Sequence, residues 1–180
     1  MLKHVSPRTV SLVSTGAFLG ALFLAFNFPS TGAQSWIPPE LREHADLTGD
    51  FRTVEGETVS LDAFSDRVLL VNFWATWCRP CLLEMPSMAR LQEEFGERGL
   101  SIVSISDEDP KTVTRFLDRH PYPFTFLIDR ERILHSRFGV TVLPSSLLLD
   151  RKRRLVYPHQ GFLQWDDEGI RRRIDRLLTE

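Results

Sequence analysis

The sequence predicts a single α/β domain whose mixed β-sheet is covered by helices on both faces. Apolar runs of strand length alternate with amphipathic segments of helical period from about residue 45 onward. One of these runs, residues 68–74, is almost continuously apolar, as is typical of a strand covered on both faces. A chain of 180 residues with 42% hydrophobic residues can bury one core, so we expect one domain with an appendage.

The appendage is predicted at residues 1–33, as a signal peptide or a membrane anchor. Lys3, His4 and Arg8 precede residues 10–28, which contain no charged side chain. This run approaches the ~20 apolar residues of a spanning helix, and Thr31 and Ala33 are small residues at the spacing of a cleavage site. Both alternatives predict export, with the chain either secreted or anchored by residues 10–28.

Residues 34–44 contain Trp36, Pro38 and Pro39 and are expected to form an extended connector to a domain at 45–180. The domain should begin with a β-hairpin within residues 46–59 that turns at Glu55 and Gly56. The formal net charge of -2 provides no field that would attract nucleic acid.

The remaining elements follow in alternating order. Strand 68–74 leads directly to a helix over 78–95, which should bend near Pro86 because proline lacks the N–H that the helix ladder needs. A strand at 100–106, a helix at 110–119, a strand at 124–128 and a short helix at 130–138 come next. Strands at 145–149 and 154–157 should form an antiparallel hairpin, and an amphipathic helix at 166–178 follows.

Cys78 and Cys81 are the only cysteines, and they lie between strand 68–74 and the start of the long helix. A sulfur at a helix N-terminus faces unpaired N–H groups and the positive end of the helix dipole, which stabilise a thiolate. Residues three apart share one side of a helix, so Cys81 can attack a mixed disulfide formed at Cys78. Cys78 is therefore predicted to attack a substrate disulfide, and Cys81 to resolve the intermediate.

The residues around the cysteines are predicted to tune this chemistry. Pro80 presets the first helical turn, and the cation of Arg79 further stabilises a nearby thiolate. Trp74 and Trp77 flank the pair and are expected to shape the surface that a substrate approaches. Trp165 is expected to serve packing, and the basic run at 151–154 is expected to be a solvated turn.

Other uses of a cysteine pair can be compared with the sequence. A covalent haem site needs histidine after the second cysteine, where Leu82 stands, and the histidines show no zinc-ligand spacing with the cysteines. A permanent structural disulfide over so short a loop would add little stability. Cu(I) binding by both thiolates stays open as an alternative. We expect no cofactor and no resident metal, because the redox-active group is the Cys78–Cys81 pair itself.

The run from Phe73 to Cys81, followed by Glu84, Met85 and Pro86, resembles the membrane-associated bacterial thioredoxin-like proteins of the TlpA/ResA family. Residues 142–146 match the same family ahead of a strand, and the resemblance spans about residues 47–178. It implies a thioredoxin-like fold with an N-terminal β-hairpin extension, located in the bacterial periplasm or at the outer face of the cell membrane. A peroxidase is set aside because no proline and threonine precede Cys78 in the arrangement of that motif.

The resemblance also implies roles for individual residues. The family's proline at the position of Pro144 is cis and packs beside the cysteines, and the backbone before it, here Leu143, pairs with substrate. Thioredoxins proper have a buried aspartate where Asn72 stands, and Asn72 cannot accept a proton. The resemblance places the proton acceptor for Cys81 at Glu108 instead, with a solvated loop carboxylate as the alternative. Glu84 is a weaker candidate with an expected structural role.

The function implied is reduction of disulfides in exported proteins, with apocytochrome c as the leading substrate and a membrane thiol donor of the DsbD/CcdA type. The alternatives are reduction of a copper-delivery protein during oxidase assembly, carriage of Cu(I), and oxidation of newly exported proteins. The sequence does not choose the direction of electron flow, since that depends on the reduction potential.

Overall fold

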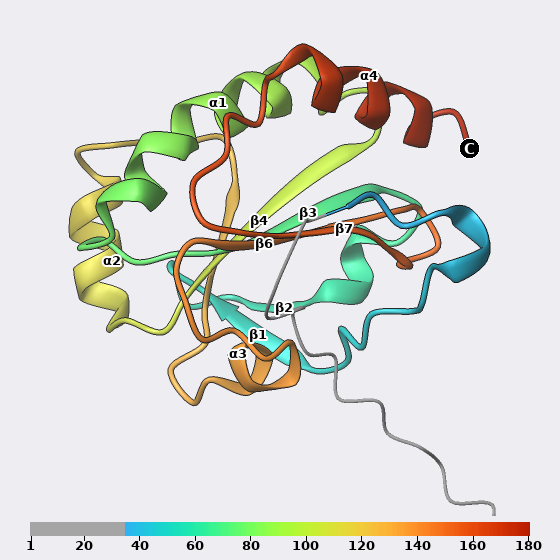
Figure 1. Ribbon diagram of the computed structural model, residues 1–180. Helices are drawn as coiled ribbons and strands as arrows, with labels where there is room; N and C mark the ends of the chain where they lie inside the picture. Colours follow the sequence, from blue (N-terminus) through green and yellow to red (C-terminus); the bar gives the residue numbers. More distant parts are fainter. Residues whose placement is uncertain (1–34) are drawn as a thin grey trace, which may run out of the picture.

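Seven strands form one mixed β-sheet in the computed structural model, which describes residues 35–180 (Figure 1). The strand order is β2-β1-β5-β4-β3-β6-β7. The predicted appendage at 1–33 lies outside the described residues. The strands are β1 (Asp50–Thr53), β2 (Thr58–Ser60), β3 (Val68–Phe73), β4 (Leu100–Ser106), β5 (Thr125–Ile128), β6 (Ser145–Leu149) and β7 (Leu155–Gln160).

Four α-helices and two short 3-10 helices accompany these strands within residues 35–180. They are η1 (Pro39–Leu41), η2 (Leu61–Phe64), α1 (Arg79–Phe95), α2 (Pro110–Leu117), α3 (Ile133–Arg137) and α4 (Glu168–Leu177). Every α-helix and strand predicted from periodicity is present, with bounds that differ by a few residues. Among residues 35–180, no helix combines the length and apolarity needed to cross a membrane.

Strand β3 lies inside the sheet, as its apolar run predicts. It pairs with β4 in parallel and with β6 in antiparallel orientation, and all six of its residues are buried. The predicted N-terminal hairpin is confirmed, because β1 pairs with β2 and then joins the sheet through β5. The predicted hairpin of β6 and β7 is also confirmed, with an irregularity at Leu148 and Leu149.

The alternation of side chains along β3 divides the core into two layers. Val68 and Leu70 face α1 and α4, while Leu69, Val71 and Phe73 face α3 and η2. Helix α2 packs near the start of α1, on the α1 side of the sheet. Figure 1 shows α1 and α4 side by side over one face and α3 under the other. Asn72 has the parity of Leu70, so its side chain points toward α1.

The sequence predicts the extended connector at residues 34–44, and residues 36–44 of it lie against the outer edge of β7. The Ile37 N–H donates to the Val156 carbonyl at 2.8 Å, and the Leu155 N–H donates to the Glu43 carbonyl at 2.7 Å. The Trp36 ring stacks on Tyr157 with centroids 4.7 Å apart. The folded unit therefore includes residues before Ala45, and this segment covers an edge that would otherwise expose unpaired backbone groups.

Candidate active site

The cysteine pair lies at the N-terminus of α1, as the sequence predicts. Cys78 is the N-cap residue, and its Sγ accepts a hydrogen bond from the Cys81 N–H at 3.4 Å. The two sulfurs form a disulfide, with Cα atoms 5.3 Å apart. Cys78 is 4% exposed, whereas Cys81 is completely buried. Of the two cysteines, only Cys78 thus has any exposed surface.

The residues between and before the cysteines are at the surface. Arg79 and Pro80 are exposed, and Pro80 occupies the first turn of α1. Trp77 is 72% exposed, the largest value among the large hydrophobic side chains of the described residues. An exposed indole next to a cysteine pair can make apolar contacts with another molecule.

Trp74 differs from this expectation, because its side chain is completely buried. Its N–H continues the β3 ladder by donating to the Ile105 carbonyl at 3.0 Å. The indole ring packs against Phe116 and Phe126, with centroid distances of 5.4 Å and 5.6 Å. The prediction that Trp74 shapes the substrate surface is therefore wrong. Trp74 instead packs in the buried apolar cluster that contains both cysteines.

The Leu143–Pro144 peptide bond is cis, as the resemblance implied. Ser145, directly after it, pairs with Phe73 at the end of β3, so this loop lies beside the segment that leads to Cys78. Leu143 packs against the apolar cluster that contains both cysteines. The Pro144 carbonyl accepts a hydrogen bond from the Gly161 N–H at 2.8 Å, which ties the loop to the end of β7.

Glu108 is half-buried and contacts the loop that precedes the cysteines. Its Oε2 accepts from the Thr76 N–H at 2.6 Å, and its Oε1 accepts from Thr76 Oγ1 at 2.8 Å. Ser106 Oγ lies 3.3 Å from Oε2. Glu108 is therefore held near the cysteines by specific contacts, unlike a solvated loop carboxylate, and it fixes the backbone two residues before Cys78.

A second carboxylate, Glu84, belongs to α1 and is completely buried. Its Oε1 accepts from Asn72 Nδ2 at 2.8 Å, and its Oε2 accepts from the Leu163 N–H at 3.3 Å. The same Asn72 amide donates to Ser146 Oγ at 3.0 Å. Burial raises the pKa of Glu84 to about 7, because these hydrogen bonds only partly compensate for lost hydration.

The sequence indicated Glu84 and Asn72 but not their connection to Ser146 and Leu163. Asn72 meets Ser146 because they are directly opposite in the β3–β6 register. Leu163 lies in the loop between β7 and α4, far from Glu84 along the chain. The only local signal for Glu84 is its spacing, since it stands three residues after Cys81 on the same side of α1.

This arrangement has the parts required for thiol-disulfide exchange. A helix N-terminus stabilises the thiolate of the partly accessible cysteine, the second cysteine is already within bonding distance, and two carboxylates lie on adjoining segments. An exposed apolar surface borders the pair at Trp77. The Cys78–Cys81 pair in this arrangement can exchange two electrons and two protons with the dithiol or disulfide of another molecule.

Comparison with known proteins agrees with this geometry. The chain is 34% identical over 109 residues to the thiol-disulfide oxidoreductase ResA of Halalkalibacterium halodurans, which covers 60% of this chain and 62% of that protein. The match therefore spans less than two thirds of the relative's length.

Solved structures show the same fold. A proposed DsbE-type thiol:disulfide interchange protein from Chlorobium tepidum superposes with a TM-score of 0.67 at 27% identity, covering 76% of this chain and 98% of that one. A secreted thiol-disulfide isomerase from Corynebacterium glutamicum gives 0.74 at 19% identity, covering 86% and 98%. The predicted thioredoxin-like fold is confirmed.

The model of the AhpC/TSA family matches residues 42–158. This range runs from the segment along β7 through the cysteine pair and the Pro144 loop to β7 itself. It holds the site described above, and by this match the chain belongs to the AhpC/TSA family.

Proposed function

We propose that this protein is a thiol-disulfide oxidoreductase that reduces disulfides in extracytoplasmic proteins. The observation that carries the proposal is the Cys78–Cys81 disulfide at the N-terminus of α1, where Cys78 keeps a small exposed surface and Cys81 is completely buried. Similarity to proteins named ResA and DsbE supports the same chemistry. The redox-active pair serves in place of a cofactor.

In the proposed reaction, the reduced protein begins as a thiolate at Cys78 and a thiol at Cys81. The Cys78 thiolate attacks one sulfur of a substrate disulfide, and the other substrate sulfur leaves as a thiolate. Cys81 then loses its proton and attacks the Cys78 sulfur, which releases the second substrate thiol. The substrate gains two electrons, its two sulfurs take up one proton released by Cys81 and one from water, and the protein is left with the disulfide seen in the structure.

Glu108 is the proposed acceptor of the Cys81 proton. Its contacts with Thr76 keep the carboxylate beside the loop that enters α1. Glu84 is a second candidate, because a carboxyl group with a pKa of about 7 can exchange protons near neutral pH. We propose that Leu143 pairs with the substrate backbone at the cis-Pro144 loop, with Trp77 contacting apolar substrate residues.

The proposed substrates are exported proteins with accessible disulfides, and apocytochrome c is the leading one. The proposed location is the bacterial periplasm or the outer face of the cell membrane, with residues 10–28 as an anchor or signal, and the proposed donor is a membrane thiol protein of the DsbD/CcdA type. An unfolded chain suits this site, since backbone pairing at Leu143 requires little of the substrate's sequence.

The reduction potential of the Cys78–Cys81 pair tests the direction of this reaction. The full chain in detergent would be equilibrated with defined glutathione or dithiothreitol buffers, and the thiols counted by alkylation. A value near the ~-270 mV of thioredoxin supports a reductant. A value near the ~-120 mV of a strong oxidant contradicts it and favours disulfide insertion. A pair that retains Cu(I) in stoichiometric amount without turning over disulfides would instead indicate a copper carrier.

A further inference from the structure

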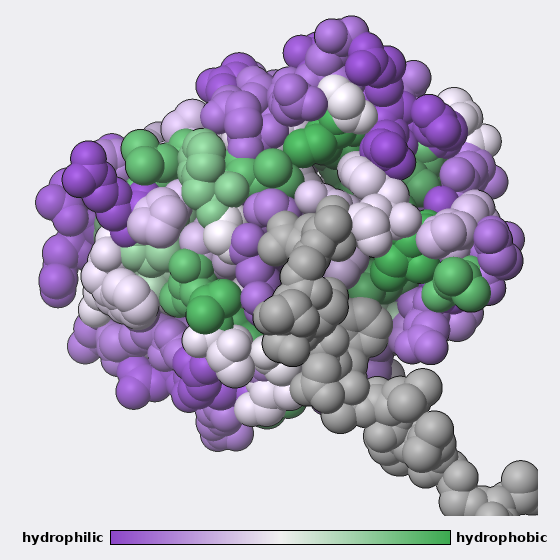
Figure 2. Space-filling model, viewed as in Figure 1, coloured by the Kyte–Doolittle hydropathy of each residue, from purple (hydrophilic) through white to green (hydrophobic). Residues whose placement is uncertain are grey.

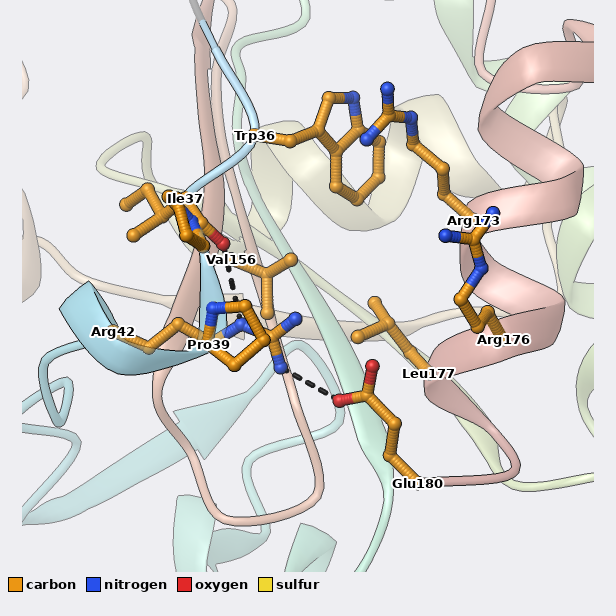
Figure 3. A pocket seen from close by; sticks show the side chains of 10 residues that line it. Trp36, Ile37, Pro39, Arg42, Val156, Arg173, Arg176, Leu177 and Glu180 are labelled. Atoms are coloured by element: carbon orange, nitrogen blue, oxygen red, sulfur yellow. Dashed lines mark hydrogen bonds and ion pairs between the residues drawn. The ribbon is translucent and has the colours of Figure 1, made fainter.

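A groove lies between the N-terminal segment and α4, away from the cysteines (Figure 3). Its volume is about 340 Å³. Trp36 and Pro39 form one wall, and Arg173, Arg176 and Leu177 of α4 form the other (Figure 3). The groove therefore combines apolar surface with three guanidinium groups, those of Arg42, Arg173 and Arg176.

The carboxylate that lines the groove is already paired. Glu180 accepts a hydrogen bond from Arg42 at 2.7 Å, and Arg42 also lies 3.3 Å from the buried Asp150. Arg173 and Arg176 have no carboxylate partner within residues 35–180. The groove thus carries an excess of positive charge, and it suits an anion attached to a body that can contact apolar walls.

The neighbouring arginines of α4 behave differently. Arg171 pairs with Glu94 at 2.6 Å, and Arg172 pairs with Glu168. Arg173 instead lies over the Trp36 ring, with 4.7 Å between its Cζ and the ring centroid (Figure 3). Figure 2 shows hydrophilic side chains along the upper rim, where α4 lies. Only the groove side of this helix leaves its cations unpaired among the described residues.

The chain approaches the groove from the predicted anchor. Ser35 is the first described residue, and it directly precedes Trp36 in the groove wall. Residues 10–28 end seven positions before Ser35. Seven residues span at most about 25 Å, so an anchored chain would hold the groove within that distance of the membrane.

We propose that the groove binds the phosphate of an anionic phospholipid headgroup in the membrane that holds residues 10–28. The phosphate would lie between Arg173 and Arg176, as guanidinium groups favour phosphate oxygens. The indole of Trp36 would contact the glycerol region, since tryptophan favours the headgroup level of a bilayer. This proposal rests on the predicted anchor and is independent of the redox function.

Headgroup binding here would orient the cysteines away from the membrane. The groove contacts Val156 near the start of β7, whereas Gln160 at its end pairs with Ser145 beside the cis-proline loop. Figure 1 agrees, because the start of α1 and the C-terminus lie at opposite sides of the molecule. The active site would then face exported substrates in the compartment.

Arginine footprinting tests the proposal on the full chain in nanodiscs. Discs of phosphatidylcholine alone and discs containing phosphatidylglycerol would be treated with phenylglyoxal, and modification rates read by peptide mass spectrometry. Arg173 and Arg176 should react about fivefold more slowly over phosphatidylglycerol, as expected for cations at an anionic surface. Arg172 on the same helix is the internal control, and its rate should change little. Inorganic phosphate added to phosphatidylcholine discs should give no protection.

A pair of variants provides the matched control. Arg173→Gln/Arg176→Gln should lose the quenching of Trp36 by phosphatidylglycerol that carries a headgroup quencher, while Arg171→Gln/Arg172→Gln should retain it. Both should reduce a protein disulfide as fast as wild type, because these arginines lie far from the cysteines. Equal footprints in both discs, equal protection of Arg172, protection by free phosphate, or failure to co-elute with the discs would each overturn the proposal.

Discussion

The side-chain amide of Asn72 lies 2.8 Å from Glu84 Oε1, and both side chains are completely buried between β3 and α1. The amide donates and the carboxylate accepts, so the contact keeps a potentially charged group inside the protein. One hydrogen bond from Asn72 and one from the Leu163 N–H do not replace full hydration. The pKa of Glu84 is accordingly raised from 4.5 to about 7.

Glu84→Gln should change how stability depends on pH. A carboxyl group whose pKa is raised by folding stabilises the protein fully at low pH, and this contribution is lost as the pH rises from about 4.5 through about 7. Wild type should therefore lose roughly 3 kcal/mol of unfolding free energy relative to Glu84→Gln across this window. Urea unfolding at several pH values measures it. Glu93→Gln, on the exposed side of α1, should follow wild type, and parallel curves for Glu84→Gln would refute the raised pKa.

Substitutions of Glu108 separate proton transfer from loop positioning. Glu108→Gln keeps an oxygen that can accept from the Thr76 N–H but cannot take a proton, whereas Glu108→Ala loses both capacities. We expect Glu108→Gln to slow resolution of a mixed disulfide by about 10²-fold while its stability stays within about 1 kcal/mol of wild type. Stopped-flow release of a fluorescent thiol measures the rate. A Gln variant as fast as wild type, beside a slow Ala variant, would show that Glu108 only positions the loop.

The elements of the sheet and the cysteine helix could be predicted because their signals are local. Strand β3 is an unbroken apolar run, and the cysteines precede an amphipathic helix of 17 residues. Whether a side chain near the site points into the core or toward solvent is harder to predict. Trp74 and Trp77 are equally aromatic neighbours of Cys78, but the Trp74 N–H still continues the ladder with Ile105, so only Trp77 turns outward.

Long-range pairing accounts for what the sequence did not reveal. The docking of residues 36–44 depends on long-range hydrogen bonds such as the one from the Ile37 N–H to the Val156 carbonyl, which no periodic pattern in the sequence reveals. The contact between Asn72 and Ser146 depends on the register of two strands that are separated by more than 70 residues. Local periodicity predicts the helices and strands, whereas these contacts depend on how the strands and segments are aligned with one another in the folded protein.

Asp150→Asn should loosen the N-terminal segment. Burial raises the pKa of Asp150, but hydrogen bonds from Arg154 and Arg42 outweigh it and hold the pKa below its ordinary value. This contribution to stability is present above pH 3.8 and is lost as the pH falls through the lower pKa of the folded state. At neutral pH the variant should lose about 2–3 kcal/mol, and the difference from wild type should narrow in acid.

Chemical denaturation at neutral and acidic pH measures this loss. Asp62→Asn is the control, because Asp62 pairs with Arg153 while its own side chain is 72% exposed. Its loss should stay below about 1 kcal/mol. If Asp150→Asn and Asp62→Asn are equally stable, the interaction of Asp150 with Arg42 does not stabilise the docking of residues 36–44.

Serine at either cysteine should give opposite outcomes in the exchange reaction. Cys81→Ser leaves the Cys78 thiolate at the helix N-terminus, so the protein can attack a disulfide but cannot release the mixed disulfide. It should accumulate a covalent mixed-disulfide complex that dithiothreitol cleaves by reduction. Cys78→Ser retains only the buried sulfur of Cys81 and should form no such complex.

Non-reducing gels of each variant with a disulfide-containing apocytochrome c or a denatured model protein measure the complex. Because Cys78 is 4% exposed and Cys81 is fully buried, trapping through Cys81 would require α1 to open at its first turn. A complex of equal yield with Cys78→Ser would therefore contradict the assigned order of attack. A complex with Cys81→Ser alone, formed faster as the pH rises, would support a Cys78 thiolate as the attacking group, since the thiolate and not the thiol reacts.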